Sequence, residues 1–491
     1  MPTTARYRSL CCAVSLVGIA LAGCGPDVAS SGGWPTGGET PAPVDGGATR
    51  SPTGAPLDLA MNNAKPDLAM THSMPDLAMA PSKPDLAMTP SMPDLAMPPA
   101  MPDLAPPAAP AVPATLFGLH IQRADSTTPW PTSSFGAWRL WDSHVAWPSL
   151  EPSQGQWYWG ALDNDVALAQ QHNVDVLLPL GLSPTWASAR PTEGSAYQPG
   201  NAAEPANIND WTNYVRTVAT RYKGKVHYYE IWNEPNLTVF YTGTVDTMVT
   251  LAQAAYTTLK QVDPTIQVVC PSTTENDTTW IDSFWSKGGT AYTDIVGYHF
   301  YVWPDGPENM LAQINQVQQV MSSHGLSNKP LWDTEAGWQI ANSTGGPVAG
   351  NGVLDDMTAA AFVARAYAVQ WNAGVSRYFF YAWDDNQMGM TELDSTTVKP
   401  PGQALGVVYS WLSGASMGTC STDGSGTWQC PITRSNGYAA WMLWNPNQTV
   451  NYPVPGNWGA RTRRDLTGAK NTVTGQSTQS VGPSPILLEN Q

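Results

Sequence analysis

The sequence predicts an α/β protein: a (β/α)8 barrel with a small C-terminal β-sandwich domain, preceded by a disordered repeat linker. Three observations predict it. Eight short apolar runs alternate with helix-length patterns over roughly 290 residues, which fits a (β/α)8 barrel in count and in size. Past residue 412 the helical periodicity stops, and short strand patterns separated by Gly, Asn and Pro follow. Before residue 114 the chain consists largely of proline-rich repeats with few large apolar side chains.

The expected barrel strands are short runs rich in β-branched and aromatic residues. They lie at residues 115–122, 137–142, 174–181, 226–232, 266–272, 294–301, 330–338 and 377–385. Helix-length patterns separate most of them, for example at 209–222, 245–263, 307–324 and 354–373. The alternative is an open, doubly wound sheet, but no glycine-rich phosphate-binding turn follows the first strand. We therefore expect a closed TIM barrel over residues 114–412.

The segment 25–113 is expected to be a disordered tether rather than a folded domain. The motif "PDLAM" recurs every nine residues, with its prolines at Pro66, Pro75, Pro84, Pro93 and Pro102. Solenoid repeats usually need 20 or more residues and a shared apolar face, which a unit this short cannot provide. The prolines favour an extended, semi-rigid stalk.

The N-terminus, residues 1–24, has the pattern of an export signal. Arg6 and Arg8 precede an apolar run over 10–22, which is shorter than the about 20 residues of a membrane span. The following "LAGC" resembles the processing box of bacterial lipoproteins, which implies that Cys24 carries a lipid anchor. The alternative is an ordinary cleaved signal with a chance cysteine. We expect an exported lipoprotein of the cell envelope or cell surface, and Gly25 favours the outer membrane by the same resemblance.

The remaining cysteines and the net charge indicate which bonds, cofactors and partners to expect. Cys420 and Cys430 flank the turn-rich "STDGSGTWQ" and are expected to form a disulfide, whereas Cys270 is expected to be a buried strand residue. No spacing of Cys and His suggests a metal site, and no cofactor is expected. A net charge of −16 argues against nucleic acid as a partner.

The C-terminal segment 413–491 is expected to form the β-sandwich. Its favoured role is to cover one side of the barrel and add stability. The alternative is a sugar-binding module, because the segment contains Trp428, Trp441 and Trp444.

Two glutamates end apolar barrel strands. Glu234 follows the fourth strand in "YYEIWNEPN", and Glu335 ends the seventh in "WDTEAGW". In such barrels functional side chains lie at the C-terminal ends of the strands. A carboxylate among aromatic side chains is costly unless it has a partner or a function.

The pair "IWNEPN" and "TEAGW" resembles glycoside hydrolase clan A, whose carboxylates lie on strands four and seven, and the similarity covers about residues 115–400. The resemblance implies a retaining glycosidase that cleaves β-glycosidic bonds through a covalent intermediate. Glu234 would be the acid/base, with a raised pKa, and Glu335 the nucleophile, held ionised.

The resemblance also implies a set of substrate-binding residues. Asn233 would hydrogen-bond the sugar 2-hydroxyl, and in "GYHFY" His299 and Tyr301 would line the site, with Tyr301 touching the nucleophile. Trp383 would lie under the sugar, and Arg139 would keep the nucleophile ionised. Trp186, which follows the third strand, is a further candidate for sugar stacking, with plain core packing as its alternative.

Two functions remain to be separated. The first is a surface-anchored retaining glycosidase acting on a carbohydrate substrate. The second is a non-catalytic carbohydrate-binding lipoprotein on a decayed barrel. A decayed enzyme usually loses a carboxylate first, so the presence of both glutamates favours the enzyme.

Overall fold

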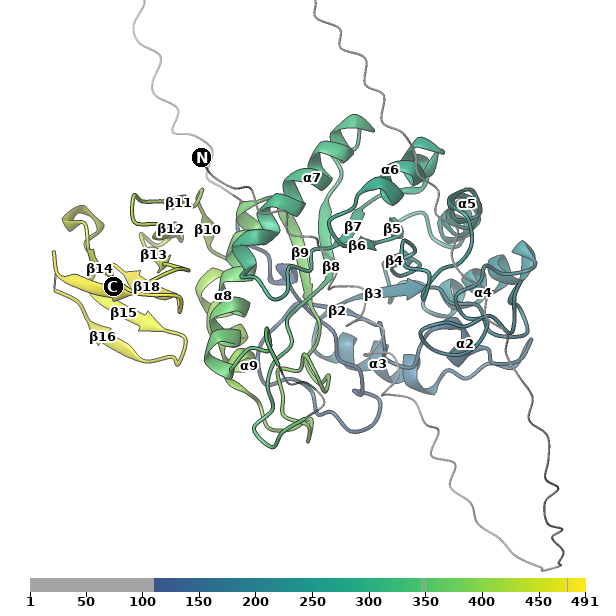
Figure 1. Ribbon diagram of the computed structural model, residues 1–491, viewed down its shortest axis with the longest axis horizontal. Coiled ribbons are helices and arrows are strands. Elements are labelled where there is room, and N and C mark those ends of the chain that lie inside the picture. The colour runs from purple at the N-terminus through teal and green to yellow at the C-terminus, as the bar shows by residue number, and fades with distance from the viewer. Residues whose placement is uncertain (1–109, 347, 349, 475) are drawn as a thin grey trace, which may run out of the picture. The chain divides into compact units, whose positions relative to one another are not determined.

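The structure, a computed structural model, describes residues 110–491 apart from residues 347, 349 and 475. The expected signal peptide with Cys24, and the expected linker up to residue 109, lie outside the described residues. Among the residues that are described, none of the helices combines the length and the apolar character needed to cross a membrane. Two parts follow along the chain, a barrel and a β-domain (Figure 1).

The barrel is built on a parallel sheet with the strand order β5-β4-β3-β2-β1-β9-β8-β7-β6. Its strands are β1 (Phe117–Leu119), β2 (Ala137–Arg139), β3 (Asp175–Leu180), β4 (Tyr228–Ile231), β5 (Gln267–Val269), β6 (Thr273–Thr274), β7 (Val296–His299), β8 (Leu331–Ala336) and β9 (Val375–Phe380). A parallel bridge between Val269 and Ile295 joins β5 to the chain just before β7 and closes the ring. Because β5 and β6 share the fifth position, the eight-stranded barrel is confirmed.

Helices surround this sheet (Figure 1). They are α2 (Trp147–Leu150), α3 (Gly160–Gln171), α4 (Ile208–Arg221), α5 (Val245–Val262), α6 (Thr279–Ser286), α7 (Met310–Ser323), α8 (Asp356–Asn372) and α9 (Pro400–Leu412), with the 3-10 helices η1 (Ala114–Leu116), η2 (Gly289–Tyr292) and η3 (Pro307–Asn309). The helix starts follow from local chemistry. The side chain of Asn207 accepts a hydrogen bond from the Asn209 amide at α4, and Asp355 accepts two backbone bonds at α8.

The barrel strands are buried on both faces, as parallel strands covered by helices must be. All six residues of β8 are buried, among them Asp333 and Glu335. A charged side chain in such a strand needs a polar partner, because an unpaired buried charge is costly. The polar residues of the barrel interior are therefore expected to pair with one another.

The C-terminal domain is a sandwich of two antiparallel sheets. The larger has the order β10-β12-β13-β18-β15-β16, with β11 on β12, and the smaller consists of β14 and β17. Their bounds are β10 (Ser416–Met417), β11 (Ser421–Thr422), β12 (Trp428–Thr433), β13 (Ala439–Trp444), β14 (Val450–Pro453), β15 (Thr462–Asp465), β16 (Lys470–Thr472), β17 (Thr478–Val481) and β18 (Ile486–Glu489), with η4 (Gly456–Trp458). Leu443, Tyr452, Val481 and Leu488 pack between the sheets. The expected β-sandwich is confirmed.

One contact between this domain and the barrel is made by a buried ion pair. The Trp444 indole N–H donates to Glu308 Oε1 at 2.7 Å, and Arg365 Nε of α8 lies 3.2 Å from the same oxygen. Arg365 also donates to the Pro483 carbonyl at 3.2 Å. Arg365 is 1 % exposed, and a charge buried to this degree needs polar partners. Glu308 of the barrel and the Pro483 carbonyl of the C-terminal domain provide them.

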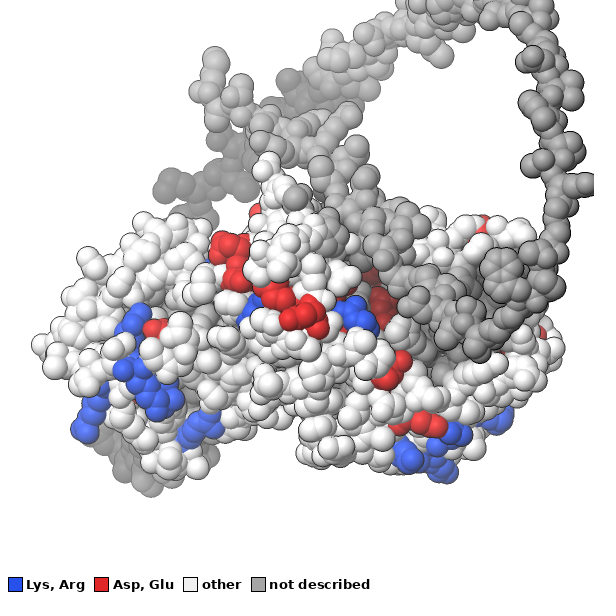
Figure 2. Space-filling view, turned by 90° about the horizontal axis from the view of Figure 1, so that it is seen from below, with Lys and Arg blue, Asp and Glu red and all other residues white. Residues whose placement is uncertain are grey.

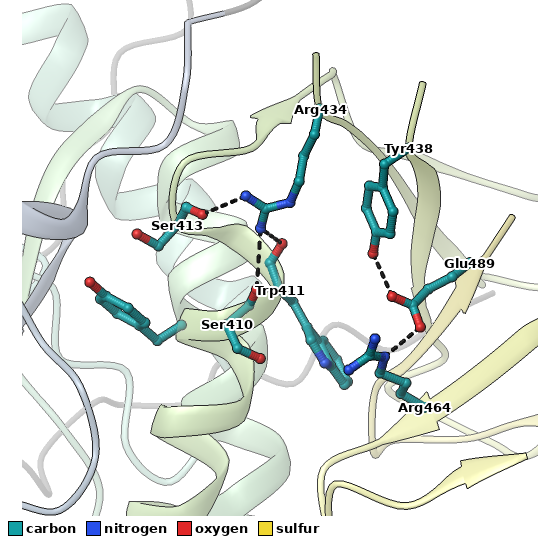
Figure 3. Close-up of a pocket in the computed structure, with 8 residues that line it drawn as sticks. Ser410, Trp411, Ser413, Arg434, Tyr438, Arg464 and Glu489 are labelled. Atoms are coloured by element: carbon teal, nitrogen blue, oxygen red, sulfur yellow. Dashed lines mark hydrogen bonds and ion pairs between the residues drawn. The ribbon is translucent and has the colours of Figure 1, made fainter. Parts of the chain in front are cut away.

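A second contact lies at the C-terminal end of α9 (Figure 3). Arg434 donates to the carbonyls of Ser410, Trp411 and Ser413, which the end of a helix leaves unpaired. Nearby, Glu489 accepts a hydrogen bond from Tyr438 at 2.7 Å and pairs with Arg464. These residues border a cavity of about 430 Å³ whose charged groups are thus already satisfied. The arrangement supports the structural role of the domain.

The tryptophans of the C-terminal domain are engaged with other rings. Trp428 stacks on the buried Trp444 with ring centroids 5.2 Å apart, and Trp441 stacks on Trp458 at 4.3 Å. These contacts also favour the covering role over sugar binding.

The start of the fold differs from the expected boundary at residue 113. Ala111 pairs with Ser416 of β10, and the Val112 amide donates to the Ala415 carbonyl at 2.8 Å. Val112 is fully buried, so the last residues assigned to the linker belong to the folded part. The structure also contains the expected disulfide between Cys420 and Cys430. Cys270, directly after β5 of the barrel, is buried as expected.

Candidate active site

A cavity of about 1130 Å³ opens at the C-terminal ends of the barrel strands, where function is expected in this fold. Its main side chains follow or end six of the barrel strands. They are Gln122 after β1, Trp141 and Asp142 after β2, Asn233 and Glu234 after β4, Tyr301 after β7, Glu335 near the end of β8, and Tyr381 after β9. The closed ring thus brings together residues about 260 positions apart, as in the bond from the His120 ring to the Phe380 carbonyl.

The two predicted glutamates meet in this cavity. Carboxyl oxygens of Glu234 and Glu335 lie within 4.8 Å of each other, and both residues are buried, at 1 % and 5 % exposure. The backbone that presents Glu234 is unusual, with φ of 62° at Trp232 and 42° at Glu234. Positive φ is strained for residues other than glycine, and such strain tends to occur at functional sites. The Glu234 amide is held by the Ser272 carbonyl at 2.9 Å.

Arg139, the last residue of β2, connects the buried polar groups. Its guanidinium donates to Glu230 at 2.6 Å, to Glu335 Oε2 at 2.7 Å and to Asn233 Oδ1 at 2.7 Å. The arginine is fully buried. Its planar guanidinium carries several N–H donors that point in different directions, so it can bind all three acceptors at once. Glu230, left without a role by the sequence pattern, is thus the buried counter-charge of Arg139 and also accepts a hydrogen bond from Ser272.

Glu335 is surrounded by donors. Besides Arg139, the Tyr301 hydroxyl donates to Glu335 Oε1 at 3.0 Å. Burial raises the pKa of Glu335 to about 7, while the Arg139 charge lowers it. Burial thus offsets much of the stabilisation that these donors give to the ionised form of Glu335.

Glu234 has a different environment. Its Oε1 lies 2.8 Å from the His299 Nδ1, and burial lowers the pKa of His299 to about 4, so that the imidazole is neutral. Burial raises the pKa of Glu234 to about 8, with Arg139 opposing the shift. Of the two carboxyls Glu234 therefore holds its proton to higher pH, which is the order that an acid and a nucleophile require.

His120, which lies directly after β1 in "FGLHIQ", is a site residue that was not predicted from the sequence. This fully buried ring lies 3.2 Å from the Phe380 carbonyl through Nδ1 and 3.1 Å from Arg139 through Nε2. Because a carbonyl only accepts, Nδ1 carries the proton, and Nε2 accepts from Arg139. The ring therefore fixes the guanidinium. Its position at a strand end was the available signal.

Two unpaired polar atoms point to where a ligand binds. Asn233 Nδ2 and His299 Nε2 are buried and have no hydrogen-bond partner among the described residues. Asn233 Oδ1 already accepts from Arg139, which orients the amide so that its N–H groups are left for another acceptor. Buried polar groups without partners are rare in folded proteins, so ligand or water is expected here.

Two residues predicted to contact the sugar lie away from the cavity lining. Trp383 is 1 % exposed and packs in the barrel core, and its place beside the cavity is taken by Tyr381. Trp186 is half-buried, donates its indole N–H to the Glu151 carbonyl at 2.8 Å and packs on Trp147. Neither is among the described residues that line the cavity. The tryptophan that does line it is Trp141.

Known proteins resemble the chain in sequence and in fold. Residues 157–383 match the model of glycosyl hydrolases family 39. A family 39 glycoside hydrolase from the gut symbiont Bacteroides cellulosilyticus WH2 superimposes with a TM-score of 0.61 at 18% identity, covering 77% of this chain and 80% of that one. A monomeric β-xylosidase from Caulobacter crescentus CB15 gives 0.57 at 15% identity, with 78% and 97% covered. A glycoside hydrolase family 30 subfamily 8 xylanase from Clostridium acetobutylicum gives 0.56 at 15% identity, with 78% and 97% covered.

The similarity to these solved structures, at such identities, concerns the fold. The match to the family model adds sequence evidence, and it spans the segment that carries both strand-end glutamates. The chain is therefore a retaining glycoside hydrolase of clan A, an enzyme that hydrolyses O-glycosyl bonds.

Proposed function

We propose that Glu335 is the nucleophile and Glu234 the acid/base of this hydrolase. The observation that carries the assignment is the spacing of the two carboxyls, within 4.8 Å, together with their different partners. Retaining glycosidases hold these groups about 5 Å apart, whereas inverting enzymes need roughly 6.5–9.5 Å to admit a water. The donors around Glu335 favour its anion, and the neutral His299 beside Glu234 does not.

The reaction then proceeds in two displacements. Glu335 attacks the anomeric carbon as the bond to the leaving oxygen breaks, and Glu234 gives its proton to that oxygen. Formation of the glycosyl ester removes the negative charge of Glu335. Glu234, now an anion, takes a proton from water as the water attacks the anomeric carbon and frees Glu335.

Asn233 and Tyr301 are proposed to assist at the reacting sugar. The free amide Nδ2 of Asn233 is available to donate to the 2-hydroxyl, where hydrogen bonds strengthen in the transition state. Tyr301 keeps the attacking oxygen of Glu335 in place. Because Arg139 binds both Asn233 and Glu335, the two contacts are held in one fixed geometry.

The substrate is proposed to be a β-linked oligosaccharide or polysaccharide, longer than one sugar unit. One wall of the cavity runs from Ala146 past Pro148 and Pro152 to Tyr158, whose side chain is 63% exposed. The backbone of this turn is fixed, since the Tyr158 amide donates to the Leu150 carbonyl at 2.8 Å. An exposed ring on a fixed turn suits stacking on the apolar face of a second sugar.

The test combines two variants with a screen of substrates. Purified enzyme is assayed on aryl β-glycosides and on xylo- and gluco-oligosaccharides, because the structural neighbours include a β-xylosidase, a xylanase and a glucosidase. Glu335→Gly and Glu234→Ala should each abolish turnover, and azide should partly rescue Glu335→Gly with inverted product. The matched control is Asp246→Asn, because Asp246 forms an exposed ion pair with Lys287. Wild-type turnover in both glutamate variants would end the assignment, and inactivity of the parent on all substrates would favour a binding protein.

We also propose that the enzyme is held at the cell envelope by a lipid on Cys24. The support is the "LAGC" processing box and the proline-rich tether that follows it. Expression in a Gram-negative host with a radiolabelled fatty acid should label the wild type and not Cys24→Ser. Equal labelling of both proteins, or of neither, would exclude a lipid at this cysteine.

A further inference from the structure

A further carboxylate of the cavity, besides the two glutamates, is held in a clamp between two tyrosine hydroxyls and is not used by the catalytic reaction. Asp142, just past β2, accepts a hydrogen bond on Oδ1 from the Tyr197 hydroxyl at 2.7 Å and one on Oδ2 from the Tyr381 hydroxyl at 2.7 Å. All three residues line the cavity that contains the glutamate pair. They come from three separate loops, so the clamp depends on the closed barrel.

The direction of these bonds makes Asp142 an acceptor. Gln122 Nε2 donates to the Tyr381 oxygen at 2.7 Å, which leaves the single hydroxyl proton of Tyr381 for Asp142. Each carboxylate oxygen thus accepts one tyrosine proton and retains a further lone pair. Asp142 has φ of 59°, a conformation that Asp and Asn adopt more readily than other side chains.

The surroundings of the clamp are acidic. Asp385, Glu234 and Glu335 line the same cavity. Of the arginines at the cavity, the buried Arg139 is bound to Glu230 and Glu335, and Arg123, which lines the cavity, pairs with Asp384. In the view of Figure 2, Asp and Glu side chains gather across the middle of one face of the molecule, with Lys and Arg side chains both among them and on the flanks. A ligand group that meets Asp142 must therefore donate hydrogen bonds, and a negatively charged group at this point would face the like charge of Asp142.

We propose that Asp142 is a specificity-determining residue that binds two hydroxyls of one substrate sugar and selects uncharged sugars over uronic acids. A carboxylate accepts from two neighbouring hydroxyls in the same way that it accepts from a bidentate donor. A sugar carboxylate at this point would face Asp142 with like charge, which is a strong element of discrimination. This inference rests on the proposed function of the cavity.

The first experiment measures binding in a catalytically inactive full-length chain. Titration calorimetry compares Glu335→Gln with Glu335→Gln/Asp142→Ala, using the best neutral oligosaccharide of the screen and the corresponding oligosaccharide of uronic acids. The added Asp142→Ala change should weaken binding of the neutral ligand about tenfold, which corresponds to about 1.4 kcal/mol. The uronic acid ligand should bind weakly to the first protein and no worse to the second. Equal affinity for the neutral ligand in both proteins would overturn the proposal.

The second experiment uses turnover and conservative variants. Asp142→Asn keeps the shape and the backbone conformation but removes the charge, and Tyr197→Phe removes one donor of the clamp. Both should raise KM for neutral aryl glycosides more than they lower kcat, and Asp142→Asn should narrow the preference for a neutral glycoside over its uronide. Asp246→Asn is the control. An unchanged preference in Asp142→Asn would contradict charge selection.

The two levels of the account fail separately. If Glu335→Gln retained turnover, the catalytic assignment would fall whatever Asp142 does. If the Glu335 variants were inactive but the Asp142 variants bound and discriminated as the parent does, only the clamp would be wrong. A change in thermal unfolding temperature identifies a variant that has lost its fold.

Discussion

Replacing Arg139 by lysine tests the connection between the buried polar groups and the catalytic pair. The guanidinium donates to Glu230, Glu335 and Asn233 and contacts the His120 ring, all from one planar group. A lysine ammonium keeps the charge but is a compact point donor on a flexible chain. It cannot reach these diverging acceptors together, so the bond to Glu335 is expected to be weakened or lost.

The size of the effect follows from that one bond. A hydrogen bond to a charged group contributes about 1.5–3 kcal/mol, so its loss should lower kcat/KM roughly 10- to 100-fold. Arg139 lowers the pKa of Glu335, and weakening this contact should raise that pKa by about one to two units. Since the nucleophile must be ionised, activity appears only above its pKa, and the acidic limb should move to higher pH.

The assay is the pH dependence of kcat/KM on an aryl β-glycoside for the wild type and for Arg139→Lys. Arg221→Lys, at an exposed ion pair with Asp163 on the outside of the barrel, serves as the matched control and should leave the profile unchanged. Thermal unfolding checks that the barrel is intact. An acidic limb at the wild-type position with full activity, or one displaced to lower pH, would refute the reasoning.

Three further predictions follow from the cavity and the domain contact. The wild-type kcat/KM should be bell-shaped around neutral pH, because the pKa of Glu335 is raised to about 7 and that of Glu234 to about 8; a profile flat from roughly pH 5 to pH 9 would contradict both roles. Tyr158→Ala should lower kcat/KM about tenfold on oligosaccharides and leave aryl monoglycosides unaffected, whereas Met357→Ala, also exposed, should change neither. Arg365→Ala should lower the free energy of unfolding by about 1–3 kcal/mol in thermal or urea unfolding, because the packing of a buried arginine and its ion pair with the half-buried Glu308 are lost. An unchanged stability would contradict the role of this contact.

The repeating pattern of the barrel could be predicted from the sequence because each strand and helix is marked by local composition. The expected helix at 245–263 is α5, Val245–Val262, and the expected strand at 330–338 contains β8. The division into β5 and β6 was not predicted, although Pro271 lies between the two strands and proline interrupts a strand ladder. The pairing of Ala111 with Ser416 joins segments about 300 residues apart, and no local pattern marks it.

The site residues Glu234 and Glu335 were predictable because their residue type and their position at a strand end together indicate a function. Residues whose role depends on which way the side chain points were not predictable. Trp383 and Trp141 both follow barrel strands, but only the second faces the cavity. The sequence carries no signal for this choice, because an indole packs equally well on a sugar or in a core. Asp142 was likewise hidden, since its importance depends on two tyrosines from distant loops.

The most direct test of the central claim is to trap the glycosyl-enzyme. The wild-type enzyme is incubated with an activated 2-deoxy-2-fluoro β-glycoside of the preferred sugar, and the protein is analysed by intact mass and by peptide mapping. The account predicts a single added glycosyl group on the peptide that contains Glu335, and no such adduct in Glu335→Gln. Attachment to another residue, or hydrolysis with inverted configuration and no adduct, would contradict it.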